Sequence, residues 1–158
     1  MKQFFQKTPS RILFTKAGYQ DVLDQKAKLL RERPDAVENL RKSRELGDLS
    51  ENGYYKASRA RLSFIDAQLK RLEKMVRLGK VVENTNTGII SFGSVVTISG
   101  LSGNQTFTIV GGDESNPSAK TISHFSPLGK ALLGKKQGDI VMLQAPKGDM
   151  EFTIVNVS

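Results

Sequence analysis

Two acidic residues, Asp48 and Glu51, stand three positions apart in the segment 46–52, between two long heptad-patterned stretches. On the first turn of a helix, residues three apart have Cβ atoms about 5 to 6 Å apart. A carboxylate pair at this distance can hold a divalent cation or orient a water molecule. Mg²⁺ is commonly held by one or two carboxylates together with waters and phosphate oxygens. The pair is therefore a candidate catalytic and metal-binding site.

The same spacing also fits a structural role. Gly47 can end one helix, Asp48 can cap the next helix, and Glu51 can reach back to close a capping box. This accounts for both acids without chemistry, and on spacing alone it is the favoured interpretation. Two carboxylates by themselves also bind Mg²⁺ poorly, so a functional site here needs ligands from elsewhere.

The residues around the acids favour the functional interpretation. Cations attract a nucleic-acid backbone, and a tyrosine ring off the heptad seam offers a face on which a base can stack. The candidate RNA-contacting residues are Arg41, Arg44, Tyr54, Lys56 and Arg59. A carboxylate pair flanked by such cations is expected where a phosphodiester arrives together with a metal ion.

Charge divides the chain into two halves. Residues 1–80 contain 19 Lys and Arg against 10 Asp and Glu, whereas residues 81–158 contain 5 Lys against 6 acids. All nine arginines lie in the first half, which is the half expected to meet a polyanion. A solvated helical surface is the simpler explanation of the charge alone.

Apolar spacing predicts two helices in the first half. From Tyr55 the pattern runs at 3-4 spacing through Ser58, Leu62, Ile65, Leu69, Leu72 and Val76, and an upstream helix has a matching seam at Tyr19, Leu23, Leu30, Val37 and Leu40. With a short connection, the two must fold back as an antiparallel coiled coil. Thr15 is the expected cap of the first helix, and Pro34 is expected to kink or split it.

After residue 80 the period changes to two. Five strands are predicted, over 94–99, 105–110, 121–124, 139–143 and 151–157, with a short helix that Ser126 caps and Gly134 ends. The fold class is therefore α+β: an N-terminal coiled-coil arm over 1–80 and a small antiparallel sheet domain with a short helix over 81–158. Residues 84–88 are the expected linker.

Composition limits the remaining classes. The chain has no cysteine, which excludes disulfides and thiolate metal sites and favours a reducing cytoplasm. Residues 1–9 lack the apolar core of a signal peptide, and no stretch is long and apolar enough for a membrane span. We expect a cytoplasmic monomer with no membrane partner.

Two long motifs resemble the bacterial Gre transcript cleavage factors (GreA/GreB), and the GreA members in particular. The first is the segment 44–52 followed by Tyr55, with Phe64-Ile65 further along. The second comprises residues 92–94, 126–139 and 146–148. The resemblance covers about residues 11–158. It departs where the family usually has Ala-Glu-Tyr and this chain has Gly53-Tyr54-Tyr55, so one acid is missing beside the pair.

This resemblance implies a coiled-coil arm and an FKBP-like C-terminal domain that docks on bacterial RNA polymerase. The arm would enter the secondary channel, where Asp48 and Glu51 help to hold a Mg²⁺ ion shared with the polymerase. The polymerase then hydrolyses the 3′ end of backtracked nascent RNA, so the chain is an accessory factor and not an enzyme itself.

Three other functions compete with this one. A regulator of the same fold could block the channel without promoting cleavage, although the retained acids argue against it. An FKBP-like half suggests a prolyl isomerase, but it offers only Phe92, Phe107, Phe125 and Phe152 as pocket aromatics. Charge alone also allows a free nucleic-acid-binding protein. The single histidine, His124, is interpreted as an ordinary sheet residue.

Overall fold

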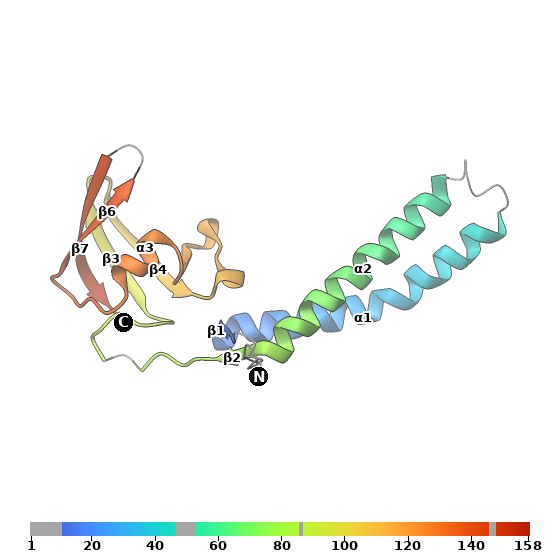
Figure 1. The fold of residues 1–158 in the computed structure, drawn as a ribbon, viewed down its shortest axis with the longest axis horizontal. Helices are drawn as coiled ribbons and strands as arrows, with labels where there is room; N and C mark the ends of the chain where they lie inside the picture. Colours follow the sequence, from blue (N-terminus) through green and yellow to red (C-terminus); the bar gives the residue numbers. More distant parts are fainter. Residues whose placement is uncertain (1–10, 47–52, 86, 146–147) are drawn as a thin grey trace, which may run out of the picture. The chain divides into compact units, whose positions relative to one another are not determined.

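The computed structural model describes residues 11–46, 53–85, 87–145 and 148–158 (Figure 1). They fall into two compact units, one containing the described residues from 19 to 79 and the other containing residues 11–18 and the described residues from 80 to 158. The first unit is helical and the second is built on a sheet.

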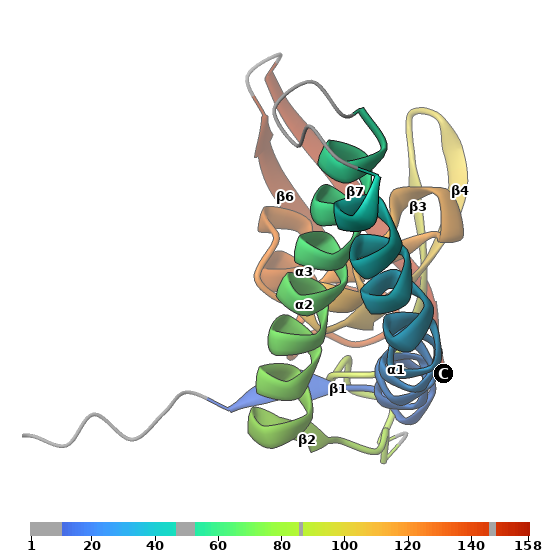
Figure 2. The same cartoon turned by 90° about the vertical axis from the view of Figure 1, so that its right-hand side faces the viewer.

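The first unit is a pair of antiparallel helices, α1 (Lys16–Glu45) and α2 (Gly53–Leu78), here called the helical hairpin. The helices lie side by side in both views (Figures 1 and 2). Tyr19 Oη donates a hydrogen bond to Val76 O at 3.3 Å, and Arg33 Nε donates to Asp66 Oδ1 at 2.7 Å. As residue numbers rise along α1 from 19 to 33, the residues that they contact on α2 fall from 76 to 66. This confirms the predicted antiparallel pair.

The predicted seam of α2 is confirmed. Ser58, Ile65, Leu69 and Leu72 are buried, and Met75 is buried beside them although it was not predicted. Ile65 is fully buried and belongs to a cluster with one α1 alanine and the neighbouring leucines. This cluster supplies the apolar burial that stabilises a helix pair whose outer faces are charged.

The predicted seam of α1 is wrong at two of its five positions, while Tyr19, Leu23 and Leu40 are partly buried. Leu30 and Val37 are 50% and 41% exposed, whereas Val22, Ala36 and Ser43 are at most 6% exposed. Small side chains at Ala36 and Ser43 let the helix axes approach closely, and close approach excludes the larger neighbours from the interface. The prediction placed Leu30 and Val37 in the interface, but the residues one position earlier, Leu29 and Ala36, pack there instead.

The ends of α1 are set locally. Thr15 Oγ1 accepts a hydrogen bond from the Gly18 amide at 3.0 Å, which confirms the predicted N-cap. The helix then continues without interruption to Glu45, so Pro34 does not split it. The proline is exposed, and the seam contacts on both sides of it hold the helix together despite the backbone hydrogen bond that proline cannot donate.

The second unit contains a five-stranded sheet in the order β5-β4-β3-β7-β6. Its strands are β3 (Val95–Gly100), β4 (Gly103–Val110), β5 (Thr121–Ser123), β6 (Ile140–Ala145) and β7 (Gly148–Val157). All five predicted strands are present, and the α+β class is confirmed. One ladder differs from the antiparallel prediction, because β5 pairs with β4 in parallel.

The short helix α3 (Pro127–Leu132) packs on one face of this sheet. Ser126 Oγ accepts a hydrogen bond from the Gly129 amide at 3.0 Å, and Gly134 has a φ of 78°, so both predicted ends are confirmed. The core beneath it is aliphatic, comprising Ile90, Val96, Ile98, Ile109, Leu132, Val141 and Ile154. Two 3-10 turns, Gly112–Glu114 and Pro117–Ala119, lie between β4 and β5.

A two-stranded sheet that was not predicted pairs β1 (Ile12–Phe14) with β2 (Gly79–Val81). Next to it, Glu114 closes a hydrogen-bonded clasp within the second unit. Its carboxylate accepts from the Thr15 amide at 3.0 Å, from Thr15 Oγ1 at 2.6 Å and from the Gly111 amide at 3.0 Å. The clasp joins the start of α1 to the loop that follows β4.

Candidate functional site

The predicted acids Asp48 and Glu51 lie outside the described residues, which end at Leu46 and resume at Gly53. The structure does place the two helix ends that flank them. Ser43 near the end of α1 and Ser58 near the start of α2 are both buried, and Ser43 Oγ donates to Leu40 O at 2.8 Å. Small seam residues thus keep the helices paired close to the segment that carries the acids.

Arg41 is already paired within its own helix. Its guanidinium donates to both carboxylate oxygens of Glu38, at 2.8 and 2.9 Å, and also to Glu45. The hydrogen bond from Arg41 lowers the pKa of Glu38, and Glu38 in turn raises the pKa of Arg41. Arg41 is fully charged but locally compensated, so it is a weaker candidate for RNA contact than the sequence suggested.

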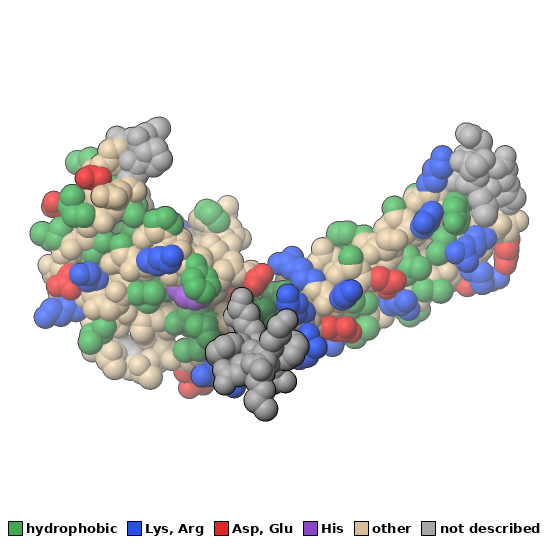
Figure 3. All heavy atoms as spheres, in the orientation of Figure 1, with side chains coloured by type: hydrophobic (Ala, Val, Ile, Leu, Met, Phe, Trp, Pro, Cys, Tyr) green, Lys and Arg blue, Asp and Glu red, His purple; other side chains and the backbone are tan. Residues whose placement is uncertain are grey.

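Arg44, Lys56 and Arg59 are exposed, and none has an ion-pair partner among the described residues. Figure 3 shows Lys and Arg side chains spread along one face of the helical hairpin. These three cations lie on the last turn of α1 and the first two turns of α2, close to the acids in sequence. They remain available to a phosphate backbone.

Tyr54 is 43% exposed, as expected for a residue off the seam, whereas Tyr55 is partly buried. The Tyr54 hydroxyl donates across the hairpin to Asn39 Oδ1 at 3.4 Å, a long hydrogen bond. Tyr54 forms one wall of a shallow hollow, and part of its side chain is open to solvent. The other residues that line the hollow include Ala36, Ala57, Ser58 and Arg61.

Two ion pairs between the helices were not predicted. Arg61 Nη2 lies 2.5 Å from Glu32 Oε2, and Arg33 Nε lies 2.7 Å from Asp66 Oδ1. A correct heptad assignment for both helices would have predicted these two ion pairs, because the two residues of each pair lie beside the seam at the same height along the hairpin. Arg61 thus belongs to the helix interface, and its guanidinium also lies 6.0 Å from the Phe64 ring.

Among the described residues, no cluster of three His, Cys, Asp or Glu side chains could hold a metal ion. The predicted metal ligands Asp48 and Glu51 lie outside these described residues. Within the described part of the chain, no helix is long and apolar enough to cross a membrane.

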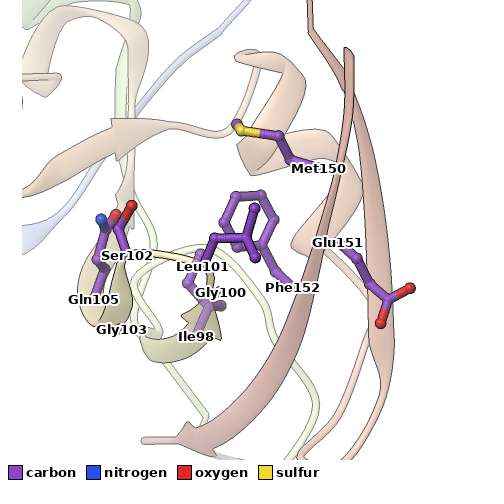
Figure 4. Close-up of a pocket in the computed structure, with 9 residues that line it drawn as sticks. All are labelled: Ile98, Gly100, Leu101, Ser102, Gly103, Gln105, Met150, Glu151 and Phe152. Carbon is purple, nitrogen blue, oxygen red and sulfur yellow. The ribbon is translucent and has the colours of Figure 1, made fainter. Parts of the chain in front are cut away.

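The second unit offers little to a prolyl isomerase. A hollow of about 140 Å³ lies at the β3–β4 turn and beside β7, and Phe152 is its one aromatic wall (Figure 4). Binding pockets for small molecules are usually about 300 to 1,000 Å³. Phe92 packs instead against His124, whose Nδ1 lies 3.0 Å from Val110 O. The four phenylalanines do not gather around this hollow.

Two family models together match nearly the whole described chain. The model for the C-terminal part of the transcription elongation factors GreA/GreB matches residues 74–158, and the model for the N-terminal part of these factors matches residues 12–81. The boundary between the two matches falls where α2 ends and β2 begins.

Two sequence relatives agree with the family models. The chain is 40% identical to transcription elongation factor GreA of Maridesulfovibrio salexigens, covering 94% of this chain and 95% of the relative. It is 37% identical to GreA of Desulfovibrio desulfuricans, covering 89% and 90%. A solved structure, GreA factor homolog 1 of Thermus thermophilus, is 30% identical with a TM-score of 0.44, covering 94% and 99%.

Proposed function

Because the chain belongs to the GreA/GreB family of transcription elongation factors, we propose that it stimulates cleavage of the 3′ end of backtracked RNA by bacterial RNA polymerase. The helical hairpin enters the polymerase secondary channel, and the second unit docks on the polymerase surface. One observation carries this proposal: the match extends through both halves of the chain and includes the segment with Asp48 and Glu51.

The chain lends groups to an active site that the polymerase supplies. The carboxylates of Asp48 and Glu51 would hold a Mg²⁺ ion together with ligands that the polymerase supplies. When bound, this ion activates water and stabilises the charge that develops on the phosphodiester. Because the polymerase supplies the other ligands, two carboxylates that bind Mg²⁺ weakly by themselves are sufficient to complete the site.

The exposed cations beside the acids support the same function. Arg44, Lys56 and Arg59 attract the RNA phosphates toward the two acids, which by themselves would repel the phosphates. Tyr54 presents the open part of its ring to the unpaired 3′ nucleotides, where stacking does not depend on base identity. In this function the chain acts as a cytoplasmic monomer, and its partners are RNA polymerase and the RNA 3′ end.

The test is an RNA cleavage assay on stalled elongation complexes with purified polymerase from the same organism. Asp48→Asn and Glu51→Gln should each lower stimulated cleavage by at least about 10²-fold while binding to polymerase is retained. Asp35→Asn is the matched control, since Asp35 is an exposed acid on α1 outside the candidate site. Full stimulation by Asp48→Asn would refute the assigned role.

A regulator that blocks the channel would give a different pattern. The wild-type chain would then inhibit elongation without shortening the RNA, and substitution of the two acids would leave that inhibition intact. Weak RNA binding without polymerase, lost as salt is raised, would instead indicate a free nucleic-acid-binding protein.

A further inference from the structure

One acid outside the candidate site holds the start of α1. Glu114, at the end of the 3-10 turn that follows β4, accepts hydrogen bonds from the Thr15 amide at 3.0 Å and from Thr15 Oγ1 at 2.6 Å. Its other carboxylate oxygen accepts from the Gly111 amide at 3.0 Å, so the carboxylate bridges two segments of the second unit. The first turn of α1 begins with Lys16 and contains no acid. Glu114 therefore supplies the negative charge that stabilises the N-terminus of this helix.

Close backbone packing surrounds the same carboxylate. A Cβ added at Gly111 would lie 2.2 Å from Leu13 O, and a Cβ added at Gly18 would lie 1.5 Å from Glu114 Oε1. Phe14, between these segments, is fully buried. The pairing of β1 with β2 also ties the start of α1, but each strand has only three residues, and isolated two-stranded pairs are marginally stable in water. The Glu114 clasp is therefore the tie that holds the first turn of α1 most firmly.

The length of α1 magnifies any movement at its start. The helix has 30 residues, so at about 1.5 Å per residue it is about 45 Å long. A tilt of about 5° at its first turn would move its last turn by about 4 Å. Asp48 follows the last residue of α1, Glu45, by three positions in the sequence. Because a misplacement of about 1 Å can cost about 10²-fold in rate, the two candidate acids need an α1 helix that does not tilt at its start.

We propose that Glu114 is a positioning residue for RNA cleavage. It acts through Thr15 and α1 and contacts neither the RNA nor the metal ion. By holding the first turn of α1 on the loop after β4, it keeps the far end of the helix where Asp48 and Glu51 would complete the metal site. This role rests on the proposed function, in which polymerase binds the second unit.

A cleavage assay at increasing factor concentration separates positioning from binding. In Glu114→Ala, the cleavage rate at saturating factor should fall at least about tenfold, while the factor concentration for half-maximal stimulation should change less than about twofold. Glu83→Ala is the matched control, because it removes an exposed acid of the second unit outside the clasp, and it should change neither value. A variant that only folded less well would have a smaller active fraction, which raises the half-maximal concentration and leaves the saturating rate unchanged.

A double variant separates positioning from stability. Adding Gly18→Ala to Glu114→Ala improves the helix propensity of α1 and should raise the midpoint of thermal unfolding above that of Glu114→Ala. It does not restore the clasp, so the saturating cleavage rate should stay at least about tenfold below that of the wild type. Thr15→Ser, which keeps the hydroxyl that donates to Glu114, should cleave within about twofold of the wild-type rate, whereas Thr15→Val should not.

Three results would overturn the positioning role. The first is an unchanged saturating rate in folded Glu114→Ala, and the second is a change in the half-maximal concentration alone. The third is recovery of the cleavage rate together with stability in the double variant, which would show that Glu114 only stabilises the fold. Each of these leaves the proposed function intact, because the wild-type chain still stimulates cleavage. Failure of the wild-type chain to stimulate cleavage overturns the proposed function as well.

Discussion

The Glu114 clasp predicts that the effect of Gly18→Ala on stability changes sign when Glu114 is removed. A Cβ added at Gly18 would lie 1.5 Å from Glu114 Oε1, so Gly18→Ala must displace the carboxylate from Thr15. Without the clasp, the same substitution should only improve helix propensity. Gly18→Ala should therefore destabilise the wild-type chain but stabilise a Glu114→Ala chain.

The magnitudes follow from the hydrogen bonds. The carboxylate accepts from two backbone amides and one hydroxyl at part-buried positions, and its loss leaves those donors without their charged partner. Glu114→Ala should cost about 2 to 3 kcal/mol in the second unit. Gly18→Ala should cost about 1 to 2 kcal/mol in the wild type, since a helix gain of about 1 kcal/mol offsets part of the loss. In the Glu114→Ala background it should gain about 1 kcal/mol.

Amide hydrogen exchange across residues 12–18 is the assay. A loss of about 2 kcal/mol in opening free energy corresponds to exchange about 30-fold faster. Glu83→Gln is the control, because Glu83 is exposed and outside the clasp. If Gly18→Ala has the same effect in both backgrounds, the clasp contributes nothing and the reasoning is wrong.

Three further predictions concern packing and charge. Ile65→Ala should cost about 3 kcal/mol in urea denaturation followed by helix content, because Ile65 is fully buried, whereas exposed Phe64→Ala should cost under about 0.5 kcal/mol. Gly129→Ala should cost about 3 kcal/mol in thermal unfolding, since its Cβ would lie 2.2 Å from a backbone oxygen; normal stability would contradict this packing. A double-mutant cycle on Arg33 and Asp66, each 46% exposed, should give a coupling under about 1 kcal/mol that disappears in about 1 M salt, and persistence in salt would show a more buried pair.

Regular patterns in the sequence predicted most of the fold. The 3-4 spacing predicted α2, and the period-two pattern predicted the strands. Together they predicted the fold class, because each pattern marks the residues on one buried face. The register of α1 failed because Ala36 and Ser43 do not stand out as apolar anchors, yet their small size decides the packing. The strands β1 and β2 were missed because three residues are too few to show a period.

Long-range contacts were beyond what the sequence could predict. Thr15 and Glu114 are 99 positions apart, and no local pattern indicates that they meet. The parallel pairing of β5 also depends on how the chain crosses between strands. The candidate site was found from spacing and flanking cations, but the sequence could not show that Arg41 is already paired to Glu38 and Glu45. The role of Asp48 and Glu51 stays a prediction that depends on a partner.

The most direct test of the shared metal site is a Mg²⁺ titration of stimulated RNA cleavage with saturating factor. If Asp48 and Glu51 contribute ligands, Asp48→Asn should raise the Mg²⁺ concentration for half-maximal cleavage by about tenfold or more while its affinity for polymerase is unchanged. An identical Mg²⁺ dependence for the variant and the wild type would contradict the account.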